Sequence, residues 1–113
     1  MISRSKYGNR KTERNGVKFD SRKEARRWSE LSLLEEAGAI QNLQRQVRFE
    51  LLPSQRIDGK IVERAVHYVA DFVYEQDGEK IVEDTKSPAT RTPVYIVKRK
   101  LMLWRHGIQI KEV

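Results

Sequence analysis

The first regular pattern along the chain is an apolar repeat with the spacing of an α-helix. Residues 21–37 place an apolar side chain at every third or fourth position, and Ser21 and Gly38 are typical helix ends. The apolar positions are Ala25, Trp28, Leu31, Leu33, Leu34 and Ala37. We therefore expect an amphipathic helix that packs on the core through this face, with Trp28 as an anchor.

A second helix is predicted over residues 93–105. Thr92 is a suitable N-cap, Pro93 suits the first turn, and Gly107 suits the end of the helix. The apolar positions that share one helical face are Val94, Val97, Leu101 and Trp104. The same reasoning makes this face the buried one and Trp104 a second core anchor.

Between the helices the pattern changes to the alternation of strands. Residues 45–52 and 64–76 alternate in this way, and residues 80–86 return after a tight-turn signal at Asp77-Gly78. One face of the longest strand is expected to hold Val66, Tyr68, Ala70, Phe72 and Tyr74. With a short strand at 108–110, the order α-β-β-β-α-β predicts an α/β fold whose mixed central sheet is flanked by helices.

Composition limits the class of protein. The chain has 113 residues, enough for one domain, and no cysteine, which excludes disulfides, thiolate metal sites and a cysteine nucleophile. No apolar run approaches the ~20 residues that cross a bilayer, and the basic start lacks the apolar segment of a secretory signal. We expect a protein with no membrane partner that is located in the cytoplasm.

Charge is unevenly distributed along the chain. The net charge is +7, with +6 on residues 1–30, −5 on residues 31–85 and +7 on residues 86–111. Two basic ends therefore flank an acidic middle, which favours a polyanion such as nucleic acid, although a merely soluble basic surface is the alternative. We expect residues 1–16 to be a flexible basic arm that ends in a short hairpin at Asn15-Gly16, before Val17 and Phe19, and residues 17–113 to be one folded domain. The arm residues predicted to contact phosphates are Arg4, Lys6, Arg10, Lys11 and Arg14.

The central hairpin carries the candidate chemistry. Alternation puts Asp84 and Lys86 on one face of their strand, and Asp71 converges on them if the faces of the two strands match. Two adjacent carboxylates repel each other unless a proton or a cation lies between them, and their oxygens suit Mg²⁺. A nearby lysine suits hydrolysis of a phosphodiester. The alternative is a solvated hairpin with a weak ion pair between Asp84 and Lys86.

Glu24 is a third candidate carboxylate. Helical spacing aligns it with Trp28 and Leu31, so it faces the edge of the core. However, Ser21 and Glu24 also have the spacing of a capping box, in which the glutamate satisfies a backbone N–H. From the pattern alone both roles stay open.

These residues resemble the motif of the PD-(D/E)xK nuclease superfamily. Asp71 is followed by Asp84-x-Lys86, with a glutamate on the first helix, while Ala70 stands where the motif has proline. Over residues 7–113 the chain also resembles a small phage and prophage family, catalogued as a domain of unknown function and placed in that superfamily. The stretches that carry this second resemblance are 17–25, 38–46, 68–72, 82–86 and 98–101.

The resemblance implies a restriction-endonuclease-like αβββαβ core and a Mg²⁺ or Mn²⁺ site. Asp71 is then the main metal ligand, Asp84 the second, and the backbone carbonyl of Thr85 joins them. By similarity to phage-type Holliday-junction resolving enzymes, Glu24 organises the metal, and Lys86 is the catalytic lysine.

The function expected from this resemblance is a phage or prophage hydrolase, a DNA endonuclease that cuts branched or junction DNA as a homodimer. Lys98 and Lys100 on the second helix either contact phosphates or belong to a solvated face; Lys98 is the one expected to point inward. The alternative function is a non-catalytic nucleic-acid-binding protein on a nuclease fold, and a third is a basic structural subunit.

Overall fold

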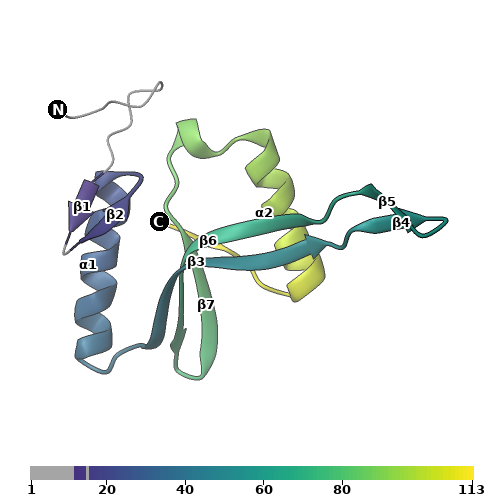
Figure 1. Cartoon of the computed structure of the whole chain (residues 1–113). Helices are drawn as coiled ribbons and strands as arrows, with labels where there is room; N and C mark the ends of the chain where they lie inside the picture. Colours follow the sequence, from purple (N-terminus) through teal and green to yellow (C-terminus); the bar gives the residue numbers. More distant parts are fainter. Residues whose placement is uncertain (1–11, 15) are drawn as a thin grey trace.

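The structure of the chain is a computed structural model that describes residues 12–14 and 16–113. Figure 1 shows a bent central sheet between two helices and a long hairpin that reaches away from the body. The elements are β1 (Thr12–Arg14), β2 (Val17–Phe19), α1 (Arg22–Glu36), β3 (Gln41–Leu52), β4 (Gln55–Ile57), β5 (Lys60–Glu63), β6 (Val66–Gln76), β7 (Glu79–Asp84), the 3₁₀ turn η1 (Pro88–Thr90), α2 (Pro93–His106) and β8 (Lys111–Glu112). Neither helix in this described part has the length and apolar character needed to cross a membrane.

The central sheet has four strands in the order β3-β6-β7-β8. β6 is antiparallel to both β3 and β7, and β8 runs parallel to β7. Phe72 of β6 packs in a cluster with residues of α1, and its neighbour Val73 packs in a cluster with residues of α2. Because successive strand residues point to opposite faces, the two helices cover opposite faces of the sheet. The prediction of an α/β fold with a mixed central sheet and flanking helices is confirmed.

Helix α1 forms where the sequence predicts it. The Ser21 hydroxyl accepts a hydrogen bond from the backbone N–H of Glu24 at 3.1 Å, which starts the helix. Trp28 packs against the rings of Phe19 and Phe72, with centroids 6.2 and 6.0 Å away. The prediction that Trp28 anchors the helix on the core is therefore confirmed.

Helix α2 occupies its predicted residues but turns a different face to the core. The predicted face is mostly exposed at Val94, Val97 and Trp104. The prediction that Trp104 is a core anchor is wrong, because Tyr95 and Met102 are the buried residues of this helix. Apolar residues occur all round this helix, so periodicity does not select a face. Tyr95 fits the interior because its ring packs in the core while its hydroxyl bonds the Glu112 carboxylate at 2.7 Å.

Strand β6 does not keep one aromatic face, contrary to the prediction. Tyr68 and Ala70 pack toward α2, whereas Phe72 and Tyr74 pack toward α1. On the partner strand β3, Gln46 lies opposite this switch point and has a left-handed φ of 55°. Asp71 lies at the same point of β6.

Two short hairpins, β1–β2 and β4–β5, and the last strand, β8, complete the fold. At the end of the expected arm, residues 12–14 form strand β1 and pair with β2, as the hairpin predicted before Val17 and Phe19 requires; residues 1–11 lie outside the described residues. The hairpin β4–β5 has no counterpart in the prediction. The last strand begins at Lys111, directly after the predicted residues 108–110.

A buried ion pair fastens α1 to the sheet. Glu83 of β7 is fully buried, and Arg27 binds it with two hydrogen bonds, Nε to Oε1 at 2.8 Å and Nη2 to Oε2 at 2.7 Å. The Tyr74 hydroxyl donates a third hydrogen bond to Glu83. This contact with Glu83 raises the pKa of Arg27, and burial raises the pKa of Tyr74 to about 12. The carboxylate is therefore held by donors from α1 and from β6.

Removing the cation of this pair should destabilise the whole fold. Arg27→Ala leaves the buried carboxylate with only the more distant Lys111 ammonium, 3.9 Å from its Oε2, and we expect the free energy of unfolding to fall by about 3 kcal/mol. Urea denaturation followed by circular dichroism measures the change. Glu30→Gln is the matched control, because Glu30 is an exposed partner of the same arginine and its pair is worth about 1 kcal/mol or less. Equal losses of unfolding free energy in the two variants would contradict the role of the Arg27–Glu83 pair in fastening α1 to the sheet.

Candidate active site

Asp71 and Asp84 lie next to each other on neighbouring strands. Phe72 pairs with Glu83 across β6 and β7, so the next position along each strand brings Asp71 opposite Asp84. Asp84 is only 4% exposed. Burial, together with a hydrogen bond to Asp71 and the charge of Asp71, raises the pKa of Asp84 to about 7. The structure thus brings together the two carboxylates that the strand alternation predicts.

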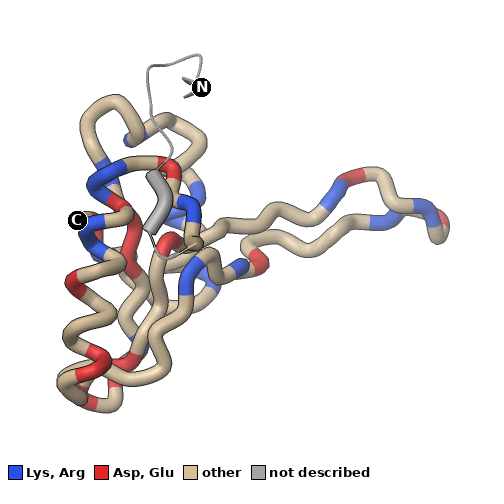
Figure 2. Tube along the Cα trace, turned by 60° about the vertical axis from the view of Figure 1, so that its left-hand side comes forward, with Lys and Arg blue, Asp and Glu red and all other residues tan. Residues whose placement is uncertain are grey.

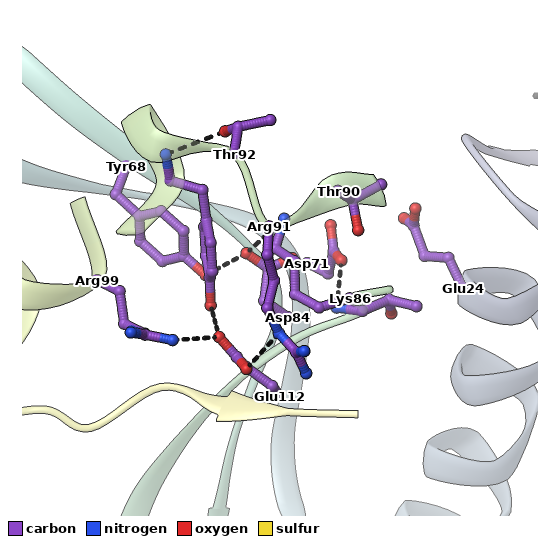
Figure 3. Close-up of polar contacts among 12 residues, drawn as sticks. Glu24, Tyr68, Asp71, Asp84, Lys86, Thr90, Arg91, Thr92, Arg99 and Glu112 are labelled. Atoms are coloured by element: carbon purple, nitrogen blue, oxygen red, sulfur yellow. Dashed lines mark hydrogen bonds and ion pairs between the residues drawn. The ribbon is translucent and has the colours of Figure 1, made fainter. Parts of the chain in front are cut away.

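Lys86 lies beside this pair of acids, just after the end of β7. Its Nζ lies 3.6 Å from Oδ2 of Asp84 and 4.1 Å from the centre of the Tyr95 ring. The Tyr68 hydroxyl donates a hydrogen bond to the same Oδ2 at 2.7 Å, as Figure 3 shows. The alternative of a solvated hairpin is wrong, because both the acid and the lysine are largely withdrawn from solvent.

Glu24 faces these residues from the other side. Figure 3 shows it pointing from α1 toward Asp71, and it is only 3% exposed. Its Oε1 accepts a hydrogen bond from Gln46 at 3.4 Å and lies 3.7 Å from Arg45. Burial and then the charges of Asp71 and Asp20 raise the pKa of Glu24 to about 7, against the opposing charge of Arg45. The carboxylate is therefore directed at the acidic pair, although Ser21 does cap the helix as predicted.

Thr85 contributes through its backbone nitrogen. Its N–H donates a hydrogen bond to Oδ2 of Asp71 at 2.8 Å, which fixes that carboxylate. The hydroxyl oxygen of Thr85 is buried, with no hydrogen-bond partner among the described atoms. A buried oxygen without a partner is a potential ligand or acceptor beside Asp71.

The donor set suits a hard divalent cation. Mg²⁺ is often held by one or two carboxylates and completes its shell with water and substrate phosphate. Asp71 and Asp84 supply two such carboxylates, and Glu24 faces them. Within residues 12–14 and 16–113, however, no three acidic, histidine or cysteine side chains stand close enough together to hold a metal ion jointly. The arrangement therefore offers two carboxylates that can bind a divalent cation together, with the third acid, Glu24, facing them.

A second polar network, which sequence reasoning missed, lies beside Asp84. Glu112 of β8 pairs with Asp84 in the sheet register and binds Tyr95 at 2.7 Å, Arg91 at 2.9 Å and Arg99 at 3.1 Å. The hydrogen bond from Tyr95 is the main reason that the pKa of Glu112 is lowered. These contacts hold two guanidinium groups near the acidic pair. No local pattern reveals them, because Glu112 is an isolated acid after a basic stretch.

The predicted nucleic-acid contacts are only partly described. Arg4, Lys6, Arg10 and Lys11 lie outside the described residues, and of Arg14 only the backbone, in β1, is described. Lys98 is partly buried, whereas Lys100 is exposed. Together with Arg99 and Glu112, Lys100 lines an open hollow of about 400 Å³ between α2 and the end of the chain.

The comparisons with known proteins place the chain in a family. The family model described as "Protein of unknown function (DUF1064)" matches residues 4–111. The chain belongs to the DUF1064 family. No curated protein matches the chain, and no solved structure matches it. The match to the DUF1064 model covers every carboxylate discussed above except Glu112, as well as Lys86.

The two raised carboxyl pKa values make the stability of this DUF1064 protein depend on pH. The folded state retains protons on Glu24 and Asp84 up to about pH 7, whereas the unfolded chain releases them near the ordinary values of 4.5 and 3.8. Without divalent metal, we expect the free energy of unfolding to fall as pH rises from about 4 to 7, and then to level off. Glu112 acts in the opposite direction below this interval, because its pKa is lowered.

Denaturant titrations in chelator at several pH values measure this dependence. Glu24→Gln and Asp84→Asn should each flatten it, because the amide neither binds nor releases the proton. Asp77→Asn, at an exposed turn, is the control and should leave the slope unchanged. A free energy of unfolding that rises between about pH 4 and pH 7 would contradict the prediction that the folded state disfavours the ionised forms of Glu24 and Asp84.

Proposed function

We propose that this DUF1064 protein is a DNA endonuclease that hydrolyses phosphodiester bonds with Mg²⁺ or Mn²⁺. The observation that carries the proposal is the contact of Asp71 with buried Asp84, 3.6 Å from the Lys86 ammonium. A buried pair of acids is unfavourable unless a proton or a cation separates them. A lysine beside such a pair supports chemistry on an anionic substrate rather than a purely structural role.

The roles follow from what holds each side chain. Asp71 and Asp84 would hold the cation, which when bound supplies a Lewis acid and an acidic water. The N–H of Thr85 and the Tyr68 hydroxyl fix the orientation of these carboxylates. They therefore need little reorganisation when substrate binds.

Lys86 would stabilise negative charge that develops on the phosphate. Its contacts with Asp84 and the Tyr95 ring keep the ammonium at one place beside the acids. Glu24, on the opposite side, would orient the attacking water. Its carboxylate is kept there by Gln46 and Arg45.

Nearby cations support an anionic polymer as the substrate. Arg91 and Arg99 are held by Glu112 beside the acids, and Lys23 donates a hydrogen bond to the backbone carbonyl of Lys86 at 2.7 Å. Such groups contact phosphates without reading sequence. Branched or junction DNA as the substrate, and phage or prophage origin, rest on the resemblance to resolving enzymes. We include both in the proposal, together with a restriction-endonuclease-like core.

One observation favours the second candidate, a nucleic-acid-binding protein without catalysis. Asp71 and Asp84 already have hydrogen-bond partners within the chain, and the acids with pKa values near 7 can be neutralised by protons instead of a metal. Such a protein would bind DNA through its cations and would not cleave it.

Cleavage of labelled DNA distinguishes these candidates. We expect the wild type to cut with Mg²⁺ or Mn²⁺, and to prefer a four-way junction or flap over linear duplex and single strand. Asp84→Asn and Lys86→Ala should each reduce the rate by roughly a hundred-fold or more, because each removes a group that acts in the transition state. DNA affinity should change much less than the rate.

The matched controls change the same residue types at exposed positions. Asp77→Asn and Lys80→Ala lie at the β6–β7 turn and should cut at the wild-type rate. If no substrate is cut with either metal while binding remains tight and salt-sensitive in all variants, the endonuclease proposal fails and the binding protein is favoured.

A further inference from the structure

The β4–β5 hairpin projects from the body of the protein. Its residues 53–64 are all exposed, and both views show them as a narrow ribbon that reaches away from the sheet and the helices (Figures 1 and 2). The hairpin forms its own two-stranded sheet. A two-stranded ribbon alone in water is only marginally stable. An ordered ribbon of this kind therefore fits a role in which another molecule encloses it.

The tip of the hairpin carries the same mixture of side chains on both of its faces. Arg56 pairs with Ile61, and Ile57 pairs with Lys60. Because paired residues share a face and neighbours along a strand alternate, each face has one cation and one isoleucine. Both isoleucines are exposed. Such a ribbon has no single apolar face to lay on a flat surface, but it can meet the two walls of a groove.

The cations of the hairpin are not neutralised by acids of the same chain. Among the described residues, none of Arg56, Lys60 and Arg64 forms an ion pair. The Arg56 guanidinium donates a hydrogen bond to the carbonyl of Gly59 at 3.1 Å, which holds it at the turn. Exposed cations spread along a projecting ribbon can contact phosphate groups.

The hairpin also contains two acids, Asp58 and Glu63, which leave it one positive charge in excess. Asp58 begins the turn, where it and Gly59 have left-handed φ angles of 51° and 78°. Tight hairpin turns with this geometry favour the pair Asp-Gly. The geometry of the turn therefore accounts for Asp58 without a cationic partner.

The hairpin continues the strands that carry the candidate active site. Lys60, at the tip, precedes Asp71 of β6 by eleven residues, which span at most about 36 Å at about 3.3 Å per residue. One turn of B-form DNA is about 34–36 Å long, and the same groove then faces the same side again. The major groove admits a two-stranded β-ribbon. A duplex that lies along the strands with one phosphate at Asp71 therefore presents a groove to the tip.

We propose that the β4–β5 hairpin enters the major groove of duplex DNA about one helical turn from the candidate active site. Its cations contact the phosphates that border the groove, and its isoleucines contact the edges of the bases. This inference deepens the proposed function, because it rests on DNA as the substrate but not on cleavage. The hairpin then holds the duplex beside the cut site rather than the cut site itself.

Fluorescence anisotropy of a labelled four-way junction, in chelator, measures DNA binding by the full chain without cleavage. We expect Lys60→Ala to lower the affinity about five-fold, and to reduce the slope of log affinity against log salt by about one, because one phosphate contact is lost. Lys80→Ala, at the exposed β6–β7 turn, is the matched control and should leave both quantities unchanged.

The outcomes separate this inference from the proposed function. If Lys60→Ala binds the junction as tightly as the wild type, the role of the hairpin is wrong and the endonuclease proposal stands. If the wild type binds no DNA in chelator or with Mg²⁺, both proposals are wrong.

The length of the junction arms tests where the tip lies. We expect the wild type to bind arms of about 14 base pairs at least ten-fold tighter than arms of about 7, because only the longer arms reach one helical turn. In Lys60→Ala this gain should shrink to about two-fold, since the lost contact exists only on the longer arms. An equal gain in the two proteins would overturn the proposal.

Asp58→Asn tests the sign of the partner's charge. Asparagine keeps the left-handed turn and removes a negative charge, so we expect the affinity for DNA to rise about three-fold. Asp77→Asn makes the same change in a turn of the same kind, Asp77-Gly78, where φ of Asp77 is 52°, and should leave the affinity unchanged. An affinity that stays the same or falls in Asp58→Asn would show that the tip lies away from phosphates, and a protein partner would then be favoured.

Discussion

The ion pair between Arg27 and Glu83 is the contact on which the rest of the arrangement depends. It fastens α1 to β7 at a fully buried position. Glu24 lies three residues before Arg27 on the helix, and Asp84 directly follows Glu83 on the strand. One buried pair therefore sets the position of the helical acid relative to the acids of the sheet. Buried ion pairs contribute little net stability compared with well-packed apolar side chains, but removing one partner leaves the other charge buried and is strongly destabilising.

Glu83 and Asp84 are adjacent in sequence, and both are buried, yet their carboxylates lie in different electrostatic environments. Glu83 points toward α1, where Arg27 pairs with it at 2.7 Å. Asp84 points to the other face, where Lys86 is 3.6 Å away and Asp71 opposes its ionisation. Glu83 on one face of the sheet is thus held in an ion pair, whereas Asp84 on the other face can gain or lose a proton near pH 7. This difference makes the face with Asp84 the place to look for chemistry.

Features specified by a few neighbouring residues were predictable from the sequence. The caps Ser21 and Thr92 and the turn at Asp77-Gly78 formed as expected. Asp84 and Lys86 also came together because strand alternation is local. Other features depend on distant contacts. Strand β6 changes the faces of its alternating residues near Asp71, the sheet selects which face of α2 is buried, and Glu112 becomes important only through Tyr95 and two arginines. The roles of the site residues stay predictions.

The parallel pairing of β8 with β7 has a consequence for the order in which the protein folds. Glu112 lies beside Asp84, and the backbone of Val113 bonds both Asp84 and Lys86 at 3.0 Å. A contact between segments this far apart in sequence costs more loop-closure entropy than a local hairpin or helix does. During synthesis, a chain that still lacks these residues has its acidic pair without the neighbouring strand. The candidate site is therefore complete only once residues 111–113 have docked on β7, and a nascent chain that lacks them does not carry it in finished form.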